Sequence, residues 1–294
     1  MEIDMYRIAI LGCENSHADS FLGFIKNDAR FADVEVVGVY TDEPEAAKRI
    51  SEGFGVFAAD SYDAFVGKVD GIIVTARHGD NHLKYAAPYI PYGIPMFIDK
   101  PITCDEGEAL KLVRELKRHG CKVTGGSCCK HAPLAHELAE VVSTGSHGKV
   151  YGGYLRAPIS MTNNYGGFYF YSQHLAEVLL TIFGYNPKSV MVKINGNVLT
   201  VTVRYDSYDV VAEYVDGNYK YFAYVSCDEG MIGGEYPVST PLFLTEFEEF
   251  YSILTGGEQK VSYEELIAPV NLITAMNRSI ESGKEEAVAP IGEI

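Results

Sequence analysis

Short apolar runs alternate with amphipathic segments over the first 124 residues. The runs at 6–12, 34–40, 71–74 and 95–98 are of strand length. The run at 72–74 is continuously apolar, which is typical of a strand buried on both faces of a parallel sheet. A further short strand is expected at 122–124. Five helical segments are expected between these strands. They lie at Phe21–Ile25, Pro44–Ile50, 62–66 (a short piece), Leu83–Ile90 and Asp105–His119. Strands that alternate with helices in this way predict a doubly wound α/β domain over residues 1–124.

The pattern changes after residue 124. A helix is expected at 133–143, and apolar and polar residues then alternate with period two in several runs. These runs are 151–157, 189–194, 198–205, 209–215 and 219–227. The turns Asn195-Gly196 and Asp216-Gly217 indicate antiparallel hairpins. With two more helices expected at 242–254 and 263–282, residues 125–294 are predicted to form an α+β domain with a mostly antiparallel sheet.

Charge and length exclude several classes of partner. The 294 residues carry 24 Lys and Arg against 40 Asp and Glu, a formal net charge of −16. Such a protein repels phosphate backbones and anionic lipid surfaces, so neither a nucleic acid nor a membrane is expected as a partner. No apolar stretch has the length of a membrane span and residues 1–4 do not read as a signal peptide, so we expect a cytoplasmic protein. The six cysteines lack zinc-like pairs, and no metal site is predicted.

Polar residues follow two of the predicted parallel strands. The strand at 95–98 ends in Asp99-Lys100-Pro101, which places Lys100 at the edge of a parallel sheet where ligands bind. Gly12 ends the first strand, where a dinucleotide fingerprint G-x-G-x-x-G would continue with glycines at positions 14 and 17. Glu14 and His17 stand there instead, and a carboxylate at position 14 should repel pyrophosphate. Either Glu14 points away, or His17 offsets its charge, or the loop no longer binds a dinucleotide; the helix that follows still offers unpaired N–H groups to an anion.

Two segments carry a family resemblance. The segment 70–103 resembles the H-x-x-x-A-x-x-A-x-x-x-G-x-x-V-x-x-E-K-P signature of the Gfo/Idh/MocA oxidoreductases, the relatives of glucose-fructose oxidoreductase and inositol dehydrogenase. His82, Ala86, Gly93 and Asp99-Lys100-Pro101 fall on this signature, with Asp in place of Glu. The segment 166–177 is similar to the later D-x-G-x-H-x-x-D motif of the family. The C-terminal helices also match family endings, so the resemblance covers essentially the whole chain.

The second motif places candidate catalytic residues. His174 and Glu177 fall on it, whereas Phe170 and Ser172 replace its Asp and Gly. In the family the Asp orients the imidazole, so its loss puts a polyol dehydrogenase of standard type in doubt and leaves Tyr171 or Glu177 as possible replacements. Ser172 is a suitable N-cap, which would put His174 in the first turn of a helix, where the dipole favours neutral imidazole.

The resemblance implies a Rossmann-type N-terminal domain that binds NAD(H), with Lys100 and His174 as catalytic residues. Lys100 would stabilise negative charge on the reacting oxygen, and His174 would accept its proton. The family register puts Thr41 where an acid often binds the ribose, with Asp42 next to it, and an acid there favours NAD over NADP. The predicted cofactor-binding residues are Gly12, Glu14, Asn15, Ser16, His17, Thr41, Asp42, Thr75, His78, His82, Asp99 and Lys100. The predicted substrate-binding residues are Lys100, Lys130, Tyr171 and His174.

The predicted reaction is hydride transfer between a nicotinamide cofactor and a secondary alcohol of a sugar or cyclic polyol. One alternative is a non-catalytic, ligand-sensing regulator on the same fold, which the altered glycine loop and Phe170 favour. Another is a lyase or epimerase that uses the cofactor transiently, or a metal instead. Tyrosines in the strands at 189–227, together with the resemblance, also predict a homodimer or homotetramer.

Overall fold

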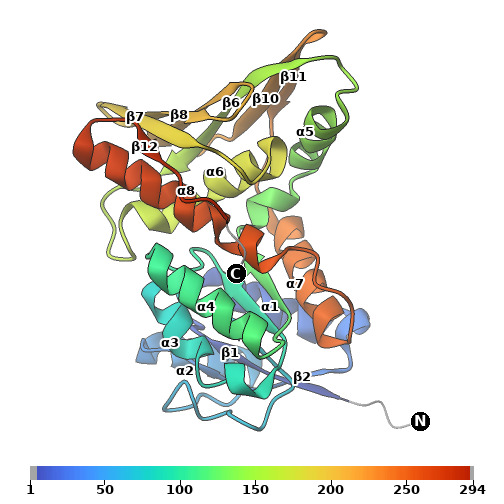
Figure 1. Cartoon of the computed structure of the whole chain (residues 1–294). Coiled ribbons are helices and arrows are strands. Elements are labelled where there is room, and N and C mark those ends of the chain that lie inside the picture. Colours follow the sequence, from blue (N-terminus) through green and yellow to red (C-terminus); the bar gives the residue numbers. More distant parts are fainter. Residues whose placement is uncertain (1–4, 292–294) are drawn as a thin grey trace. The chain divides into compact units, whose positions relative to one another are not determined.

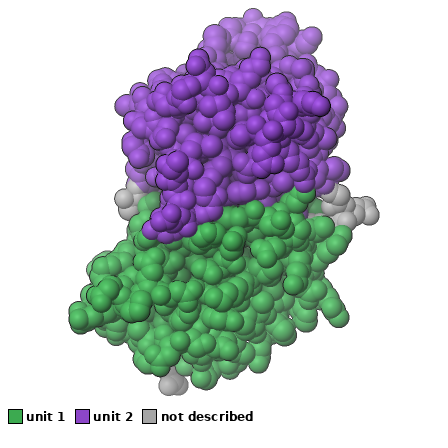
Figure 2. Space-filling view, turned by 90° about the vertical axis from the view of Figure 1, so that its left-hand side faces the viewer, with its two compact units in different colours: residues 1–126, 243–266, 294 green, residues 127–242, 267–293 purple. Residues whose placement is uncertain are grey.

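The computed structural model describes residues 5–291 and divides the chain into two compact units. Of the described residues, unit 1 contains 5–126 and 243–266, and unit 2 contains 127–242 and 267–291 (Figure 2). The predicted boundary at 124/125 lies two residues from the end of the first stretch of unit 1. Residues 243–266, however, were expected in the second domain and belong to unit 1. Residues 1–4, where the sequence predicts no signal peptide, lie outside the described residues.

The sheet of unit 1 is five-stranded and parallel, as predicted, with strand order β2-β1-β3-β4-β5. Its strands are β1 (Tyr6–Leu11), β2 (Val34–Tyr40), β3 (Gly71–Val74), β4 (Met96–Asp99) and β5 (Val123–Gly126). Strands β3, β4 and β5 are buried along their whole length, which explains the continuous apolar run of β3. Because β1 lies between β2 and β3, the strand order reverses at β1, and the ends of β1 and β3 mark a potential ligand site.

The described part of unit 1 contains four helices that lie between its strands in the sequence and a fifth that comes after most strands of unit 2. They are α1 (Ser16–Asn27), α2 (Pro44–Phe54), α3 (Asp80–Ala86), α4 (Glu106–Arg118) and most of α7 (Thr240–Leu254). Helix α4 begins as predicted, with the Asp105 side chain accepting a hydrogen bond from the Glu108 N–H. The helical piece predicted at 62–66 is wrong: this segment forms turns.

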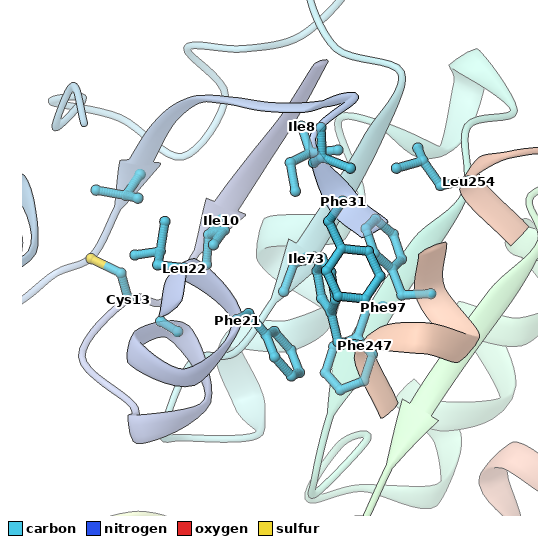
Figure 3. Packing of buried hydrophobic residues seen from close by; sticks show 14 of the residues in the cluster. Ile8, Ile10, Cys13, Phe21, Leu22, Phe31, Ile73, Phe97, Phe247 and Leu254 are labelled. Atoms are coloured by element: carbon cyan, nitrogen blue, oxygen red, sulfur yellow. The ribbon is translucent and has the colours of Figure 1, made fainter. Parts of the chain in front are cut away.

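An aromatic cluster explains why α7 belongs to unit 1. Its Phe247 is fully buried and packs against Phe31 of the short 3₁₀ helix Ala29–Phe31, with ring centroids 4.8 Å apart, and against Phe21 of α1 at 5.4 Å (Figure 3). Phe97 of β4 meets Phe21 edge to face at 5.1 Å. Burying Phe247 alone removes a large apolar surface from water. The apolar spacing in α7 predicted a helix but could not say which sheet it covers.

The sheet of unit 2 has seven strands in the order β11-β10-β6-β9-β8-β7-β12. Its strands are β6 (Val150–Ile159), β7 (Ser189–Asn195), β8 (Val198–Arg204), β9 (Asp209–Asp216), β10 (Phe222–Cys227), β11 (Gly230–Glu235) and β12 (Glu286–Ala287). All pairings are antiparallel except that of β6 with β9, which confirms the mostly antiparallel sheet. The hairpin predicted at Asn195-Gly196 connects β7 and β8: Asn195 pairs with Val198, and the turn consists of Gly196, at φ +60°, and Asn197. The hairpin predicted at Asp216-Gly217 is wrong, because β9 pairs with β6 and β8 while β10 pairs with β6 and β11.

Helices cover one face of this sheet. The helices of unit 2 are α5 (Pro133–Thr144), α6 (Phe168–Phe183) and most of α8 (Tyr263–Ser282), and α6 and α8 lie along the same side of the strands (Figure 1). Tyr214 is buried on the helix side, where its hydroxyl donates to the Ser172 carbonyl oxygen. Tyr224 lies on the opposite face, stacked against Tyr154. The strand tyrosines are therefore divided between the two faces of the sheet. Within residues 5–291, no helix combines the length and the apolar character that a membrane crossing requires.

Candidate active site

The turn after β1 needs a glycine. Gly12 has φ +89°, and a Cβ atom added to it would lie 2.2 Å from the Ala76 nitrogen, just beyond β3. The Thr75 hydroxyl donates to the Gly12 carbonyl oxygen at 3.1 Å, and Thr75 is fully buried. The chain therefore passes closely over the end of β3 and enters α1, whose N-terminus follows the turn directly.

The Glu14 carboxylate accepts hydrogen bonds from residues that follow β2 and β3. One carboxylate oxygen accepts from the Thr41 hydroxyl at 2.6 Å, and the other accepts from the Arg77 N–H at 2.7 Å. The Arg77 guanidinium also donates to the Glu14 carbonyl oxygen at 2.6 Å. Both oxygens are thus turned toward the ends of β2 and β3, which agrees with the expectation that Glu14 points aside.

A charged rim surrounds the end of β2. Asp42 accepts hydrogen bonds from the hydroxyls of Tyr40 and Tyr85, and these bonds hold the pKa of its carboxyl below the usual range. Thr41 and Asp42 also line a groove of about 570 Å³ beside α2. Lys84 lies 3.8 Å from Asp42. Two cations that follow β3 in the chain, Arg77 and Lys84, thus contact the carboxylates at the end of β2. The residues around β2 in the sequence did not predict these contacts.

His17 does not offset the charge of Glu14; this expectation is wrong. Its Nδ1 lies 3.0 Å from the Asp99 carboxylate and its Nε2 lies 3.3 Å from the Glu246 carboxylate of α7. Burial alone would lower the pKa of the imidazole, but the charge and hydrogen bond of Asp99, followed by those of Glu246, raise it to about 10. Burial alone would raise the pKa of Asp99, but His17 more than compensates and the pKa is lowered. His17 is therefore a buried imidazolium between two carboxylates.

The same network fixes the turn after β1 to the strand that precedes Lys100. The Asn15 amide donates to Asp99 Oδ2 at 2.9 Å, and the Lys100 N–H donates to Asp99 Oδ1 at 2.6 Å. Asp99 is fully buried and Lys100 is 6% exposed. A single carboxylate thus holds the β1–α1 turn and the Lys100 backbone in register, which explains why an acid precedes this lysine.

The other residues predicted in unit 1 have different surroundings. His82 is fully buried, with its Nε2 2.7 Å from the Ala76 carbonyl oxygen, and burial lowers its pKa. It therefore supports the turn after β3 rather than facing a ligand. His78 is partly exposed, with its Nδ1 accepting from the Asp80 N–H at 3.3 Å. Ser16 is exposed at the start of α1.

In unit 2, His174 lies in the second turn of α6 rather than the first. The helix begins at Phe168, after Gly166 and Gly167 with φ +94° and +57°. Ser172 is therefore an interior residue and not the predicted N-cap. With His174 seven residues along the helix, the dipole argument for its neutral form fails, because the effect is confined to the first turn.

A turn from another element reaches the imidazole. Ser127 Oγ lies 2.6 Å from His174 Nδ1, and the sulfur of Cys129 lies 3.5 Å from the same nitrogen. The Tyr171 ring is 5.3 Å from the imidazole ring. Neither Tyr171 nor Glu177, the replacements considered for the missing acid, makes the contact at Nδ1. Ser127 and Cys129 are 47 and 45 residues from His174, and no local pattern pairs them with it.

Glu177 instead fixes this turn to α6. Its Oε1 accepts from the Ser127 N–H at 3.2 Å and from the Gln173 amide at 2.8 Å, and its Oε2 lies 3.6 Å from the Lys130 ammonium. The side chains of Lys130 and Glu177 are 8% and 6% exposed. A buried ion pair with further hydrogen bonds on the carboxylate holds the short 3₁₀ helix Cys128–His131 against α6.

Comparison with known families identifies the N-terminal region. Residues 6–127 match the model of an oxidoreductase family with an NAD-binding Rossmann fold, GFO_IDH_MocA. In these residues the chain is similar to the Gfo/Idh/MocA oxidoreductases. The predicted resemblance to this family, the predicted Rossmann-type domain and the oxidoreductase class are thereby confirmed. No protein of curated function matches the chain significantly.

Solved structures share the fold of this chain at low identity. A putative myo-inositol dehydrogenase from Sinorhizobium meliloti 1021 superposes with a TM-score of 0.82 at 17% identity, covering 97% of this chain and 100% of that one. A scyllo-inositol dehydrogenase from Lactobacillus casei with bound NAD(H) and scyllo-inositol gives 0.82 at 15% identity, with 97% and 99% covered. A putative NADPH-dependent oxidoreductase from Desulfitobacterium hafniense DCB-2 gives 0.81 at 13% identity, with 98% and 99% covered.

Proposed function

We propose that the protein transfers a hydride between NAD and a secondary alcohol of a sugar or cyclic polyol. The observation that supports this best is the turn at Gly12. It lies where the strand order of a parallel sheet reverses, it approaches the end of β3 so closely that a Cβ atom would clash, and it opens directly into α1. It also lies within the residues that match the NAD-binding family. The same geometry cradles pyrophosphate in dinucleotide-binding domains.

The residues of unit 1 fit this cofactor. Gly12 and the first N–H groups of α1, at Ser16 and His17, would hold the pyrophosphate, and the groove beside Thr41 and Asp42 would take the adenosine end. Bound NAD supplies the hydride acceptor. Glu14 would not oppose the phosphates, because both of its carboxylate oxygens already accept hydrogen bonds from Thr41 and Arg77.

The charges at the end of β2 favour NAD over NADP. Glu14, Asp42 and Glu43 are acidic, whereas Arg77 and Lys84 are the cations that contact them, so five charges sum to 2 − 3 = −1. Arg77 contacts Glu14 and lies 3.6 Å from Glu43, and Lys84 lies 3.8 Å from Asp42. A 2′-phosphate would have to compete with these carboxylates for the same cations, whereas a 2′-hydroxyl could donate to Asp42.

Lys100 and His174 are the residues we propose for the chemistry. The Lys100 ammonium would donate to the reacting oxygen and stabilise its negative charge, and His174 Nε2 would exchange the proton. Tyr171 would contribute to the substrate side of His174. Lys130, by contrast, is bound to Glu177 and supports the turn that contacts His174. A homodimer or homotetramer remains part of the proposal, supported by Tyr154 and Tyr224 on the open face of the seven-stranded sheet.

Calorimetric titration with NADH and NADPH at low ionic strength tests the cofactor assignment. We expect NADH to bind at least about tenfold more tightly, a difference of about 1.4 kcal/mol. Asp42→Asn should reduce the ratio between the affinities for NADH and NADPH. Glu45→Gln, which removes an exposed carboxylate from the first turn of α2, is the matched control and should leave it unchanged. Absence of binding by either cofactor at millimolar concentration would reject the dehydrogenase and favour the ligand-sensing regulator.

A further inference from the structure

Cys129 is a candidate partner for His174 that the family motif does not contain. The Asp that orients the imidazole in the family is Phe170 in this chain, so the carboxylate expected at Nδ1 is missing. The groups at that nitrogen are Ser127 Oγ at 2.6 Å and Cys129 Sγ at 3.5 Å. Ser127 and Cys129 are both fully buried and His174 is 9% exposed. Of the two, only the thiol can become an anion near neutral pH.

The surroundings of Cys129 favour its anionic form. A hydrogen bond from the neighbouring Cys128 thiol is the largest cause, and the charge and hydrogen bond of His174, followed by a hydrogen bond from Ser127, add to it. Together they outweigh burial and hold the pKa of Cys129 well below its usual range. The Cys129 N–H also donates to Ser127 Oγ at 3.2 Å, which fixes the serine between the two reactive side chains. A thiolate next to an imidazole is the arrangement that activates cysteine in other enzymes.

The other titratable groups around the pair do not supply a competing charge. Burial, followed by the charge of Cys129, raises the pKa of Tyr221 and Tyr236, so both phenols stay protonated at neutral pH. Burial also raises the pKa of Tyr171, with the charges of Tyr219 and Cys129 adding to it. The carboxylate of Glu177 is bound to Lys130, Gln173 and the Ser127 N–H. The sulfur is therefore the anion available to His174 Nδ1.

We propose that Cys129 is a thiolate that takes the place of the missing carboxylate and holds His174 with Nδ1 protonated and Nε2 directed to the substrate. This rests on the role of His174 in the proposed function, and Cys129 acts in it as a positioning residue. The proton that leaves the sulfur is carried by Nδ1, so the pair gains no net charge. With both ring nitrogens protonated, Nε2 can donate its proton to the alkoxide formed when a carbonyl is reduced. In the reverse reaction Nε2 starts without this proton and accepts one from the alcohol.

Ultraviolet difference absorbance near 240 nm, which reports thiolates, tests the pair without a substrate. We expect the folded protein to show about one thiolate per chain between pH 6 and 8, below the pH at which an ordinary thiol ionises. Cys129→Ser and His174→Gln should each remove this signal. Cys121→Ser should not, because Cys121 is equally buried but its pKa is raised to about 11 by burial. Tyr171, Tyr221 and Tyr236, whose pKa values burial raises, remain protonated in this range and do not contribute.

If a variant does not fold, the titration of the wild-type protein alone tests whether a thiolate is present. A protein with no thiolate below pH 8, or a signal that survives His174→Gln in a folded variant, would overturn the proposal. A second measurement is the pH profile of kcat for carbonyl reduction with NADH. Cys129→Ser should shift the pH at which kcat changes while KM changes little, and Cys129→Asp should restore the wild-type profile. A chain that shows the thiolate but no hydride transfer would refute the proposed function and not the pair.

Discussion

The buried imidazolium of His17 predicts a pH dependence of stability. Its pKa is about 10 in the folded protein against 6.5 in the unfolded chain, a difference of 3.5 units. Each unit corresponds to about 1.4 kcal/mol, so the protonated ring stabilises the fold by roughly 5 kcal/mol at low pH. Because the folded pKa is raised, this contribution is complete below about pH 6.5. It is lost as the pH rises to about 10, since the folded protein must then retain a proton that the unfolded chain has released.

The reference for this measurement is the double variant His17→Gln/Glu246→Gln. In the native cluster, Asp99 and Glu246 contribute two negative charges and His17 one positive charge, a sum of −1. The double variant leaves Asp99 alone and keeps the sum at −1, but it contains no imidazole to titrate. The single variant His17→Gln leaves two buried carboxylates without their cation, and we expect it to lose about 3–5 kcal/mol of unfolding free energy at pH 7.

Urea denaturation followed by far-UV circular dichroism is the assay, since the chain has no Trp for fluorescence. Between pH 7 and 9.5, the unfolding free energy of the wild type should fall relative to the double variant by about 1.4 kcal/mol per pH unit, about 3 kcal/mol in all. Thiols such as those of Cys13 and Cys104, whose pKa desolvation raises to about 12, also destabilise the fold at high pH. They are present in both proteins and cancel in the difference. Parallel stability curves for the two proteins would show that His17 is not a buried cation.

Two further predictions concern catalysis and packing. Lys100→Ala and His174→Ala should each lower kcat on a verified polyol by about a hundredfold to ten-thousandfold while leaving the calorimetric affinity for NADH nearly unchanged; a wild-type rate in either variant would remove that residue from the chemistry. Phe247→Ala should lower the unfolding free energy, measured in urea, by about 3–5 kcal/mol. Phe57→Ala, at an exposed phenylalanine, is its control. A loss below about 1 kcal/mol for Phe247→Ala would mean that α7 is not part of the core of unit 1.

Much of the candidate site could be placed from the sequence because it follows strand ends. The apolar run at 95–98 placed Lys100 at the carboxyl end of a parallel strand, and the run at 6–12 did the same for Gly12. The partners of these residues could not be predicted in this way. Glu14 contacts Thr41 and Arg77, and His17 contacts Asp99 and Glu246, through strands and helices that are neighbours only in the folded sheet. Likewise, Phe170 showed that an acid was missing, but not that Ser127 and Cys129 stand at the imidazole.

The sequence by itself determined the local elements, because the periods of apolar residues, the glycines of tight turns and the prolines that open helices act over a few neighbouring residues. It therefore predicted the parallel sheet, the Asn195-Gly196 hairpin and the limits of α8. The tertiary structure decided what depends on contacts between distant segments. It placed α7 in unit 1 through Phe247, paired β10 with β6 although Asp216-Gly217 resembled a hairpin turn, and set the pKa of His17 through two carboxylates from separate elements. A charge far away in the sequence changes an imidazole only once folding has brought the two within a few ångströms in a medium without water, and no local pattern contains that distance.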